Sequence, residues 1–147
     1  MQLRFGFVPQ MPDQRDWRFE DHVLTTPVTA GTSFHIAESE LPPVQDQADL
    51  GSCTAHAVRL ALCRNQILKH GEYTDPSRLF LYWTFRRVDG SDMNADTGAT
   101  LRSAFKALRL WGGPPEWLWE YDPKRFGESP PMEAWVAGQG FQSLEYY

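Results

Sequence analysis

A helical period of apolar and polar residues begins at position 52 and dominates the rest of the chain. Ser52 can cap a first helix, which ends in the basic pair Lys69 and His70 with Gly71 directly behind it. The positions between these ends are apolar on nearly every face. We therefore expect this helix to be central and buried.

Three more helices are expected after the first. The second is predicted to begin at Asp75, an N-cap with Pro76 at the first helical position, and to end at Gly90. The third stops before Gly112, and one stripe along it is apolar. That stripe consists of Leu101, Ala104, Phe105 and Leu108. A short fourth helix is predicted with Ser129 as its cap and a proline at its first position.

The two ends of the chain lack this helical period. Residues 1–40 contain prolines and isolated aromatic residues, which predicts an extended N-terminal arm with short strands at most. Residues 140–147 carry strand-forming aromatic residues in alternation, which favours a strand. The whole pattern predicts an α+β fold that is mainly helical.

The composition is that of one soluble domain, with 147 residues, a formal net charge of -5 and 41% hydrophobic residues. No window approaches the ~20 apolar residues of a membrane span, and the N-terminus lacks the pattern of a signal peptide, so we expect a cytoplasmic protein without a membrane partner. Dispersed Lys and Arg residues argue against a nucleic-acid partner. Cys53 and Cys63 lie roughly 15 Å apart along one helix, so both should be free thiols.

One short stretch carries recognisable chemistry. Cys53 lies in the first turn of the first predicted helix, where unpaired backbone N–H groups and the helix dipole favour a thiolate. Gln47 precedes it by six residues, and Gly51 makes the turn between them tight. Attack of the thiolate on a carbonyl creates an oxyanion, which the Cys53 N–H and the Gln47 side-chain amide can stabilise.

Gln47, Gly51, Ser52 and Cys53 resemble the signature of the papain-like cysteine peptidases, in which a glutamine six residues before a GSC-type cysteine supplies the oxyanion hole. The stretch looks like the bacterial branch of that family, and Thr54 stands where plant and animal members usually carry tryptophan. The resemblance implies peptide-bond hydrolysis with Cys53 as nucleophile and Gln47 as oxyanion donor. It also implies that Gly51 and Ser52 lie at the substrate cleft.

The resemblance covers roughly residues 5–147. The segment around Gly98 is similar to the glycine-lined edge of the cleft, so Gly98 is expected to present its backbone to an extended substrate, with Thr97 beside it. Starting the third helix is an equally good role for Gly98. Residues 1–40 look like a leader, either a latency device that covers the cleft or a plain structural strap. Residues 41–147 look like the helical left half of the catalytic domain, ending in a strand toward the barrel half.

A peptidase of this kind also needs a histidine base and an Asn or Asp residue that orients it. In the papain pattern both follow the cysteine by about 130 to 150 residues, which from Cys53 lies beyond Tyr147. The four histidines have other interpretations: His56 belongs to the helical core, His70 to a basic last turn, and His22 and His35 to the arm. We therefore expect a peptidase half whose base comes from a second chain or from the other half.

Other functions remain open for this sequence. The helical half can serve as a non-catalytic papain-like module that holds a protein partner, inactive as a peptidase on its own, and thioester chemistry also suits a transglutaminase- or amidase-like transferase. A peptide or protein substrate is the expected partner, together with the other half, a second chain or a second copy. No cofactor is expected. A zinc site made of Cys53, His56, Cys63 and His70 is rejected, because a straight helix spreads them over about 25 Å.

Overall fold

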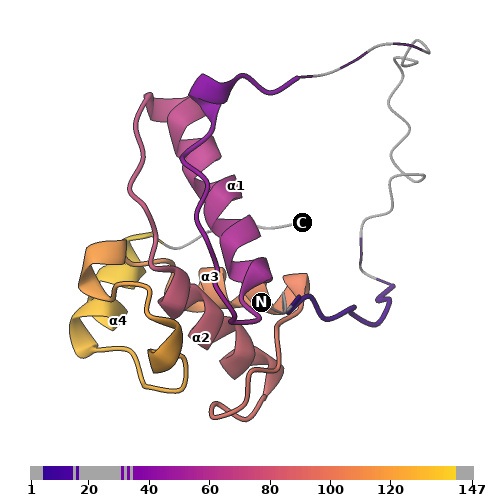
Figure 1. The fold of residues 1–147 in the computed structure, drawn as a ribbon, viewed down its shortest axis with the longest axis vertical. Coiled ribbons are helices and arrows are strands. Elements are labelled where there is room, and N and C mark those ends of the chain that lie inside the picture. The colour runs from indigo at the N-terminus through magenta and orange to yellow at the C-terminus, as the bar shows by residue number, and fades with distance from the viewer. Residues whose placement is uncertain (1–4, 15, 17–30, 32, 34, 142–147) are drawn as a thin grey trace.

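The computed structural model describes residues 5–14, 16, 31, 33 and 35–141. Four α-helices follow one another in them: α1 (Cys53–His70), α2 (Arg78–Asp89), α3 (Leu101–Trp111) and α4 (Met132–Gly138). Short 3-10 turns cover Glu38–Glu40, Glu116–Leu118, Pro123–Arg125 and Gln139–Phe141. Figure 1 shows α1 extending away from the group formed by α2, α3 and α4. The described residues contain two isolated β-bridges and no strand, so the mainly helical prediction is confirmed.

The limits of α1 agree with the prediction. The helix begins directly after Ser52 and stops at Gly71, whose φ of 78° is left-handed. The N–H of Gly71 donates to the Ile67 carbonyl at 2.8 Å, which satisfies one carbonyl of the last turn. Ser52 occupies the N-cap position but makes no side-chain capping bond, because its hydroxyl has other partners.

Two helices begin later than predicted. The N-cap of α2 is Ser77, whose Oγ accepts a backbone N–H of the first turn, while the Asp75 carboxylate binds the Arg59 guanidinium instead. Helix α4 begins after Pro131 rather than after Ser129. The reason is that two prolines follow Ser129, and each disfavours the helical conformation of the residue before it.

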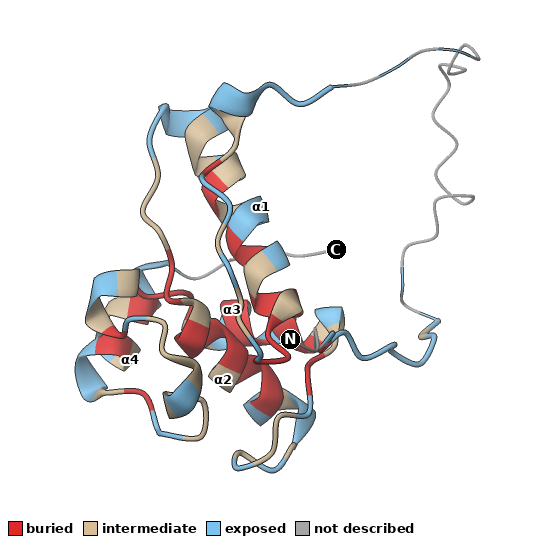
Figure 2. Cartoon of the chain, in the orientation of Figure 1, coloured by how far each residue is buried: buried red, intermediate tan, exposed pale blue. Residues whose placement is uncertain are grey.

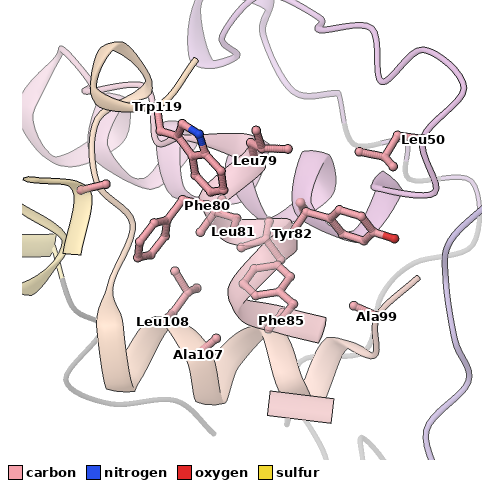
Figure 3. Packing of buried hydrophobic residues seen from close by; sticks show 14 residues of the cluster. Leu50, Leu79, Phe80, Leu81, Tyr82, Phe85, Ala99, Ala107, Leu108 and Trp119 are labelled. Atoms are coloured by element: carbon pink, nitrogen blue, oxygen red, sulfur yellow. The ribbon is translucent and has the colours of Figure 1, made fainter. Parts of the chain in front are cut away.

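The core is centred on α2. Its residues from Leu79 to Tyr82, together with Phe85, are fully buried. Figure 3 shows these side chains grouped with Leu108 of α3 and with Trp119. Trp135 of α4 closes one end of the core, where its ring packs edge-on against three other aromatic rings. These are Phe80, Trp83 and Trp111, at centroid distances of 5.0, 5.7 and 5.7 Å.

The apolar stripe predicted for α3 is only half buried. The buried face consists of Ser103, Ala104, Ala107 and Leu108. Leu101 and Phe105 are each 40% exposed. Small residues on the buried face allow the backbones of α3 and α2 to approach closely, and this packing turns the two larger side chains toward the rim.

The prediction that α1 is buried throughout is wrong. Its buried residues are Thr54, Ala55, Val58, Arg59 and Cys63. Figure 2 shows exposed and intermediate residues along the rest of the helix. Leu60 is 39% and Leu68 is 52% exposed, because the described part of the chain packs against one face of α1 only.

Two other predictions concern the chain ends and membranes. Most of the strand expected over 140–147 lies outside the described residues, and Gly140 and Phe141 belong to a 3-10 turn instead. None of the helices in the described part is long and apolar enough to cross a membrane.

A buried guanidinium fixes the loop between α2 and α3. Arg86 is completely buried, and its N–H groups donate to the carbonyls of Met93 at 3.1 Å, Ala95 at 2.9 Å and Phe126. Its charge lies 4.4 Å from the centroid of the Tyr82 ring and 5.0 Å from that of Phe126. Such stacking stabilises a desolvated cation, although burial still lowers the pKa of Arg86.

Replacing this side chain tests its role in the fold. Arg86→Met should lower the free energy of unfolding by about 3 kcal/mol, because it leaves buried carbonyls without donors. The neighbouring Arg87 is exposed, so Arg87→Met should change the free energy by no more than about 0.5 kcal/mol. Urea denaturation of the two variants measures the difference, and equal stabilities would contradict the account.

Candidate functional site

Cys53 is the first residue of α1 and is half-buried. The loop before it turns sharply at Ala48, which has a φ of 53° and donates its N–H to Asp46 Oδ1 at 2.8 Å. Gly51 and Ser52, directly before the cysteine, are buried. The chain therefore approaches Cys53 along a loop that is held by local hydrogen bonds.

The predicted oxyanion donor lies in the same loop. The Nε2 atom of Gln47 donates to the Leu50 carbonyl at 3.0 Å, which ties the side chain to the turn before Cys53. A primary amide carries two N–H bonds and a carbonyl oxygen, so the Gln47 side chain can make more than one hydrogen bond at this turn.

Asp96 links the loop before Cys53 to the segment around Gly98. The N–H of Gly51 donates to Asp96 Oδ2 at 2.9 Å, and the Tyr82 hydroxyl donates to Asp96 Oδ1. The same hydroxyl accepts the N–H of Gly98 at 3.1 Å. Burial is the main cause that raises the pKa of Tyr82, and the bond to Asp96 raises it further. The hydroxyl therefore remains a donor at neutral pH.

The space between the two segments requires glycine on both sides. A Cβ at Gly51 would lie 2.9 Å from Asp96 Oδ1. Gly98 has a φ of 71°, a left-handed conformation, and a Cβ there would lie 2.1 Å from the carbonyl oxygen of Gly6. Thr97 is exposed beside it, with its Oγ1 donating to the Gly98 carbonyl at 3.3 Å.

The N-terminal arm occupies this space. Gly6 is buried, and a Cβ on it would overlap the Gly51 carbonyl oxygen at 1.6 Å. The Ala99 N–H donates to the Gly6 carbonyl at 2.9 Å, and the Val8 N–H donates to the Ala99 carbonyl at 3.2 Å. The arm thus pairs in parallel with the segment at Gly98. A hollow at this point is lined by Phe5, Gly6, Phe7, Val8, Gly51, Asp96, Thr97 and Gly98.

His56, one turn after Cys53, is committed to other groups. Its Nδ1 lies 3.1 Å from the Ser52 carbonyl, and its Nε2 lies 3.4 Å from an N–H nitrogen of Arg78. The ring packs edge-on against Tyr121 at 5.1 Å. Burial is the main cause that lowers the pKa of His56, so the ring is neutral near pH 7. This geometry agrees with a histidine of the helical core.

The other candidate ligands and bases lie elsewhere. His70 is exposed in the last turn of α1, His35 is exposed in the arm, and His22 lies outside the described residues. Cys63 is buried, with its Sγ 3.8 Å from Asp75 Oδ1. Among the described residues, no three His, Cys, Asp or Glu side chains lie together in a way that could hold a metal ion.

Sequence reasoning missed two side chains that organise the site. These are Asp96 and Tyr121. Asp96 follows its partner Gly51 by 45 residues, and Tyr121 follows its partner Gln47 by 74 residues. A weak signal was available for Asp96 alone, since a carboxylate two residues before Gly98 is poorly explained by helix capping.

Comparison with known proteins agrees with this geometry. The chain is 33% identical, over 97% of its length, to an uncharacterized peptidase C1-like protein of Acanthamoeba polyphaga mimivirus, and it spans 50% of that protein. Its fold matches xylellain, a cysteine protease from Xylella fastidiosa, with a TM-score of 0.70 and 26% identity over 99% of this chain and 59% of xylellain. No protein-family model matches the chain.

A third similarity concerns the fold alone. A solved structure from a study of the mite allergens Blo t 1 and Der p 1 matches 74% of this chain and 39% of its own, with a TM-score of 0.50 and 17% identity. The chain therefore has the fold of the helical half of the papain-like cysteine peptidases. In sequence it is similar to the N-terminal half of the mimiviral peptidase C1-like protein.

The two cysteines should differ in reactivity. Burial raises the pKa of Cys63 to about 12, so this thiol stays protonated and inaccessible at pH 8, whereas Cys53 is half-buried at a helix start. Iodoacetamide at pH 8 should therefore modify Cys53 in the folded protein and Cys63 only after unfolding in urea. Peptide mapping by mass spectrometry locates the label, and modification of Cys63 in the folded protein would contradict the structure.

Proposed function

We propose that this chain is the nucleophile-bearing part of a cysteine peptidase that hydrolyses peptide bonds. The main support is the position of two groups. The half-buried Cys53 thiol lies at the start of α1, and the Gln47 side-chain amide lies in the loop directly before it. The Cys53 sulfur forms a bond to the substrate carbonyl carbon, while the Cys53 N–H and Gln47 Nε2 donate to the oxyanion. The C–N bond then breaks, the amine leaves with a proton, and water hydrolyses the thioester.

The proton in this sequence needs a base, and we propose that it comes from outside residues 1–147. His56 is the histidine nearest to Cys53 in sequence, and its two ring nitrogens already face Ser52 and Arg78. The related proteins are longer, since the chain spans 50% of the mimiviral relative and 59% of xylellain. A histidine with an orienting Asn or Asp, on the other half of the fold or on a second chain, completes the site.

The exposed face of α1 supports such a completing half. The exposed apolar residues on this helix are Ala57, Leu60, Ala61 and Leu68. Leu60, Ala61 and Leu68 follow Ala57 by three, four and eleven residues, which are intervals that fall on one side of a helix. This is the side that the described residues leave exposed (Figure 2). Covering this stripe would bury apolar surface, which favours association with a second half or a partner chain.

The substrate is proposed to lie between Gly51 and Gly98. Two glycines allow a backbone to approach closely, and the main chain at Gly98 and Ala99 already pairs with the arm. An extended peptide can make the same kind of backbone pairing. The side chain of Ser52 is buried against Tyr121, so Ser52 contributes to the cleft through its backbone.

Residues 1–40 are proposed to act as a leader that covers the cleft, with residues 41–147 as the helical half. Gly6 fills the position between Gly51 and Gly98 that a substrate backbone would need. Release of the arm is then required before a peptide reaches Cys53.

A second contact anchors the arm to α3. The Arg102 guanidinium forms ion pairs with Asp13 and Asp16, each at 2.7 Å, and donates to the Met11 carbonyl at 3.2 Å. The backbone N–H of Arg102 donates to the Gln10 side chain at 3.0 Å. These contacts lie on the segment directly after the part of the arm in the cleft.

A peptidyl vinyl sulfone tests the nucleophile. Labelling should be stoichiometric, saturable, about 10-fold or more faster than that of free cysteine in the same buffer, and abolished by Cys53→Ala. Cys63→Ala is the matched control and should react like the unmodified chain. Intact-mass kinetics measure the rate. Labelling at the rate of free cysteine would instead favour a non-catalytic binding module.

The arm is tested by loosening its anchor. Arg102→Gln should increase the labelling rate of Cys53 about 3- to 10-fold, because its two partly exposed ion pairs contribute roughly 0.3 to 0.7 kcal/mol each. Arg109 is exposed on the same helix, so Arg109→Gln should leave the rate unchanged. Raising the salt concentration should reduce the difference between the unmodified chain and Arg102→Gln. An unchanged rate in Arg102→Gln would remove the support for a covering arm.

A further inference from the structure

The Tyr121 hydroxyl forms hydrogen bonds with both ends of the loop that carries the proposed oxyanion donor. We propose that Tyr121 is a positioning residue, which fixes Gln47 and Cys53 relative to each other so that both can donate to one oxyanion. This inference rests on the proposed function of these two residues and adds a third residue that touches neither the substrate nor the reacting atoms.

The contacts define which way each proton points. The Tyr121 hydroxyl donates to the Gln47 backbone carbonyl at 2.9 Å, because a carbonyl can only accept. The same hydroxyl lies 2.6 Å from Ser52 Oγ, so the serine hydroxyl must be the donor in that bond. His56 Nδ1 faces the Ser52 carbonyl and therefore carries the imidazole proton. Tyr121 thus links Gln47, the first residue of the 47–52 loop, to Ser52, which is the last residue of the loop and the N-cap of α1.

These bonds explain an irregularity of α1. A serine at the N-cap position normally accepts a backbone N–H of the first helical turn, but Ser52 makes no such bond. Its hydroxyl is used by Tyr121 instead. The helix therefore lacks a stabilising side-chain cap. Ser52, directly before Cys53, is instead linked through the Tyr121 hydroxyl to the backbone of Gln47.

Tyr121 is itself held in place from two sides. The Arg78 guanidinium lies 4.4 Å above the centroid of its ring, and Arg78 forms an ion pair with Glu116 at 2.7 Å. The backbone N–H of Tyr121 donates to Glu116 Oε1 at 3.0 Å. Burial is the largest cause that raises the pKa of Tyr121, so the hydroxyl remains a donor through neutral pH. Tyr121 is therefore held by contacts to its ring and its backbone, and its hydroxyl is in the protonation state that the bond to Gln47 requires.

Two probes on the full chain separate positioning of the oxyanion donors from simple reactivity of the thiol. The aldehyde acetyl-leucyl-leucyl-norleucinal adds reversibly to Cys53: a C–S bond forms, and the thiol proton passes to the former carbonyl oxygen, which lies at the oxyanion position. Iodoacetamide forms a C–S bond with loss of iodide and creates no oxyanion. Tyr121→Phe should weaken aldehyde binding about 10- to 100-fold, because donor geometry is lost, and change the iodoacetamide rate less than about twofold.

Control variants make each outcome informative. Tyr73→Phe deletes a hydroxyl away from the site and should match the unmodified chain in both assays. Gln47→Ala should weaken aldehyde binding at least as much as Tyr121→Phe. If Gln47→Ala weakens binding and Tyr121→Phe does not, the positioning role is wrong while the proposed function stands. If Gln47→Ala has no effect, the proposed function fails, and the inference fails with it.

A milder variant covers the possibility that Tyr121→Phe does not fold. Circular dichroism and thermal melting report on folding. Ser52→Ala keeps the aromatic ring and its bond to Gln47 but removes the bond to the N-cap residue. It should weaken aldehyde binding about threefold with an unchanged iodoacetamide rate. An unchanged aldehyde affinity in folded Ser52→Ala would overturn the proposal.

Discussion

The site depends above all on one carboxylate, that of Asp96. It accepts the N–H of Gly51 on the cysteine side and the hydroxyl of Tyr82, which in turn accepts the N–H of Gly98 on the other side. Two segments 45 residues apart in sequence are thereby fixed across a space that a single backbone can fill. Arg86 holds the same loop from the core through the carbonyls of Met93 and Ala95. The loop that carries Asp96 is therefore bonded both to the proposed cleft and to the core.

A second constraint comes from the absence of side chains at three points. Gly6, Gly51 and Gly98 meet so closely that a Cβ on any one of them would overlap another group. Close approach of backbones suits the binding of an extended peptide, and it equally suits occupation by the arm. The same glycines therefore serve both the proposed substrate and the proposed leader, and only displacement of the arm separates the two states.

The sequence allowed the local features to be predicted, and the long-range ones escaped it. The start of α1 at Cys53 and its stop at Gly71 depend on neighbours a few residues away. The roles of Tyr121 and Arg102 depend on partners 74 and 89 residues distant, which no local pattern encodes. The stripe on α3 was misjudged for a related reason, because Leu101 and Phe105 are as apolar as core residues and only the approach of α2 leaves them at the rim.

Cys53 is proposed to be an acyl-transfer nucleophile whose base lies outside residues 1–147. Reaction with a peptide p-nitrophenyl ester, followed by intact mass and peptide mapping, tests it most directly, because an activated ester acylates a thiolate without a base whereas hydrolysis of the thioester needs one. We predict one acyl group per chain, on Cys53, that persists until a base-bearing half is added. Absence of acylation, or acylation spread over lysines and Cys63, would contradict it.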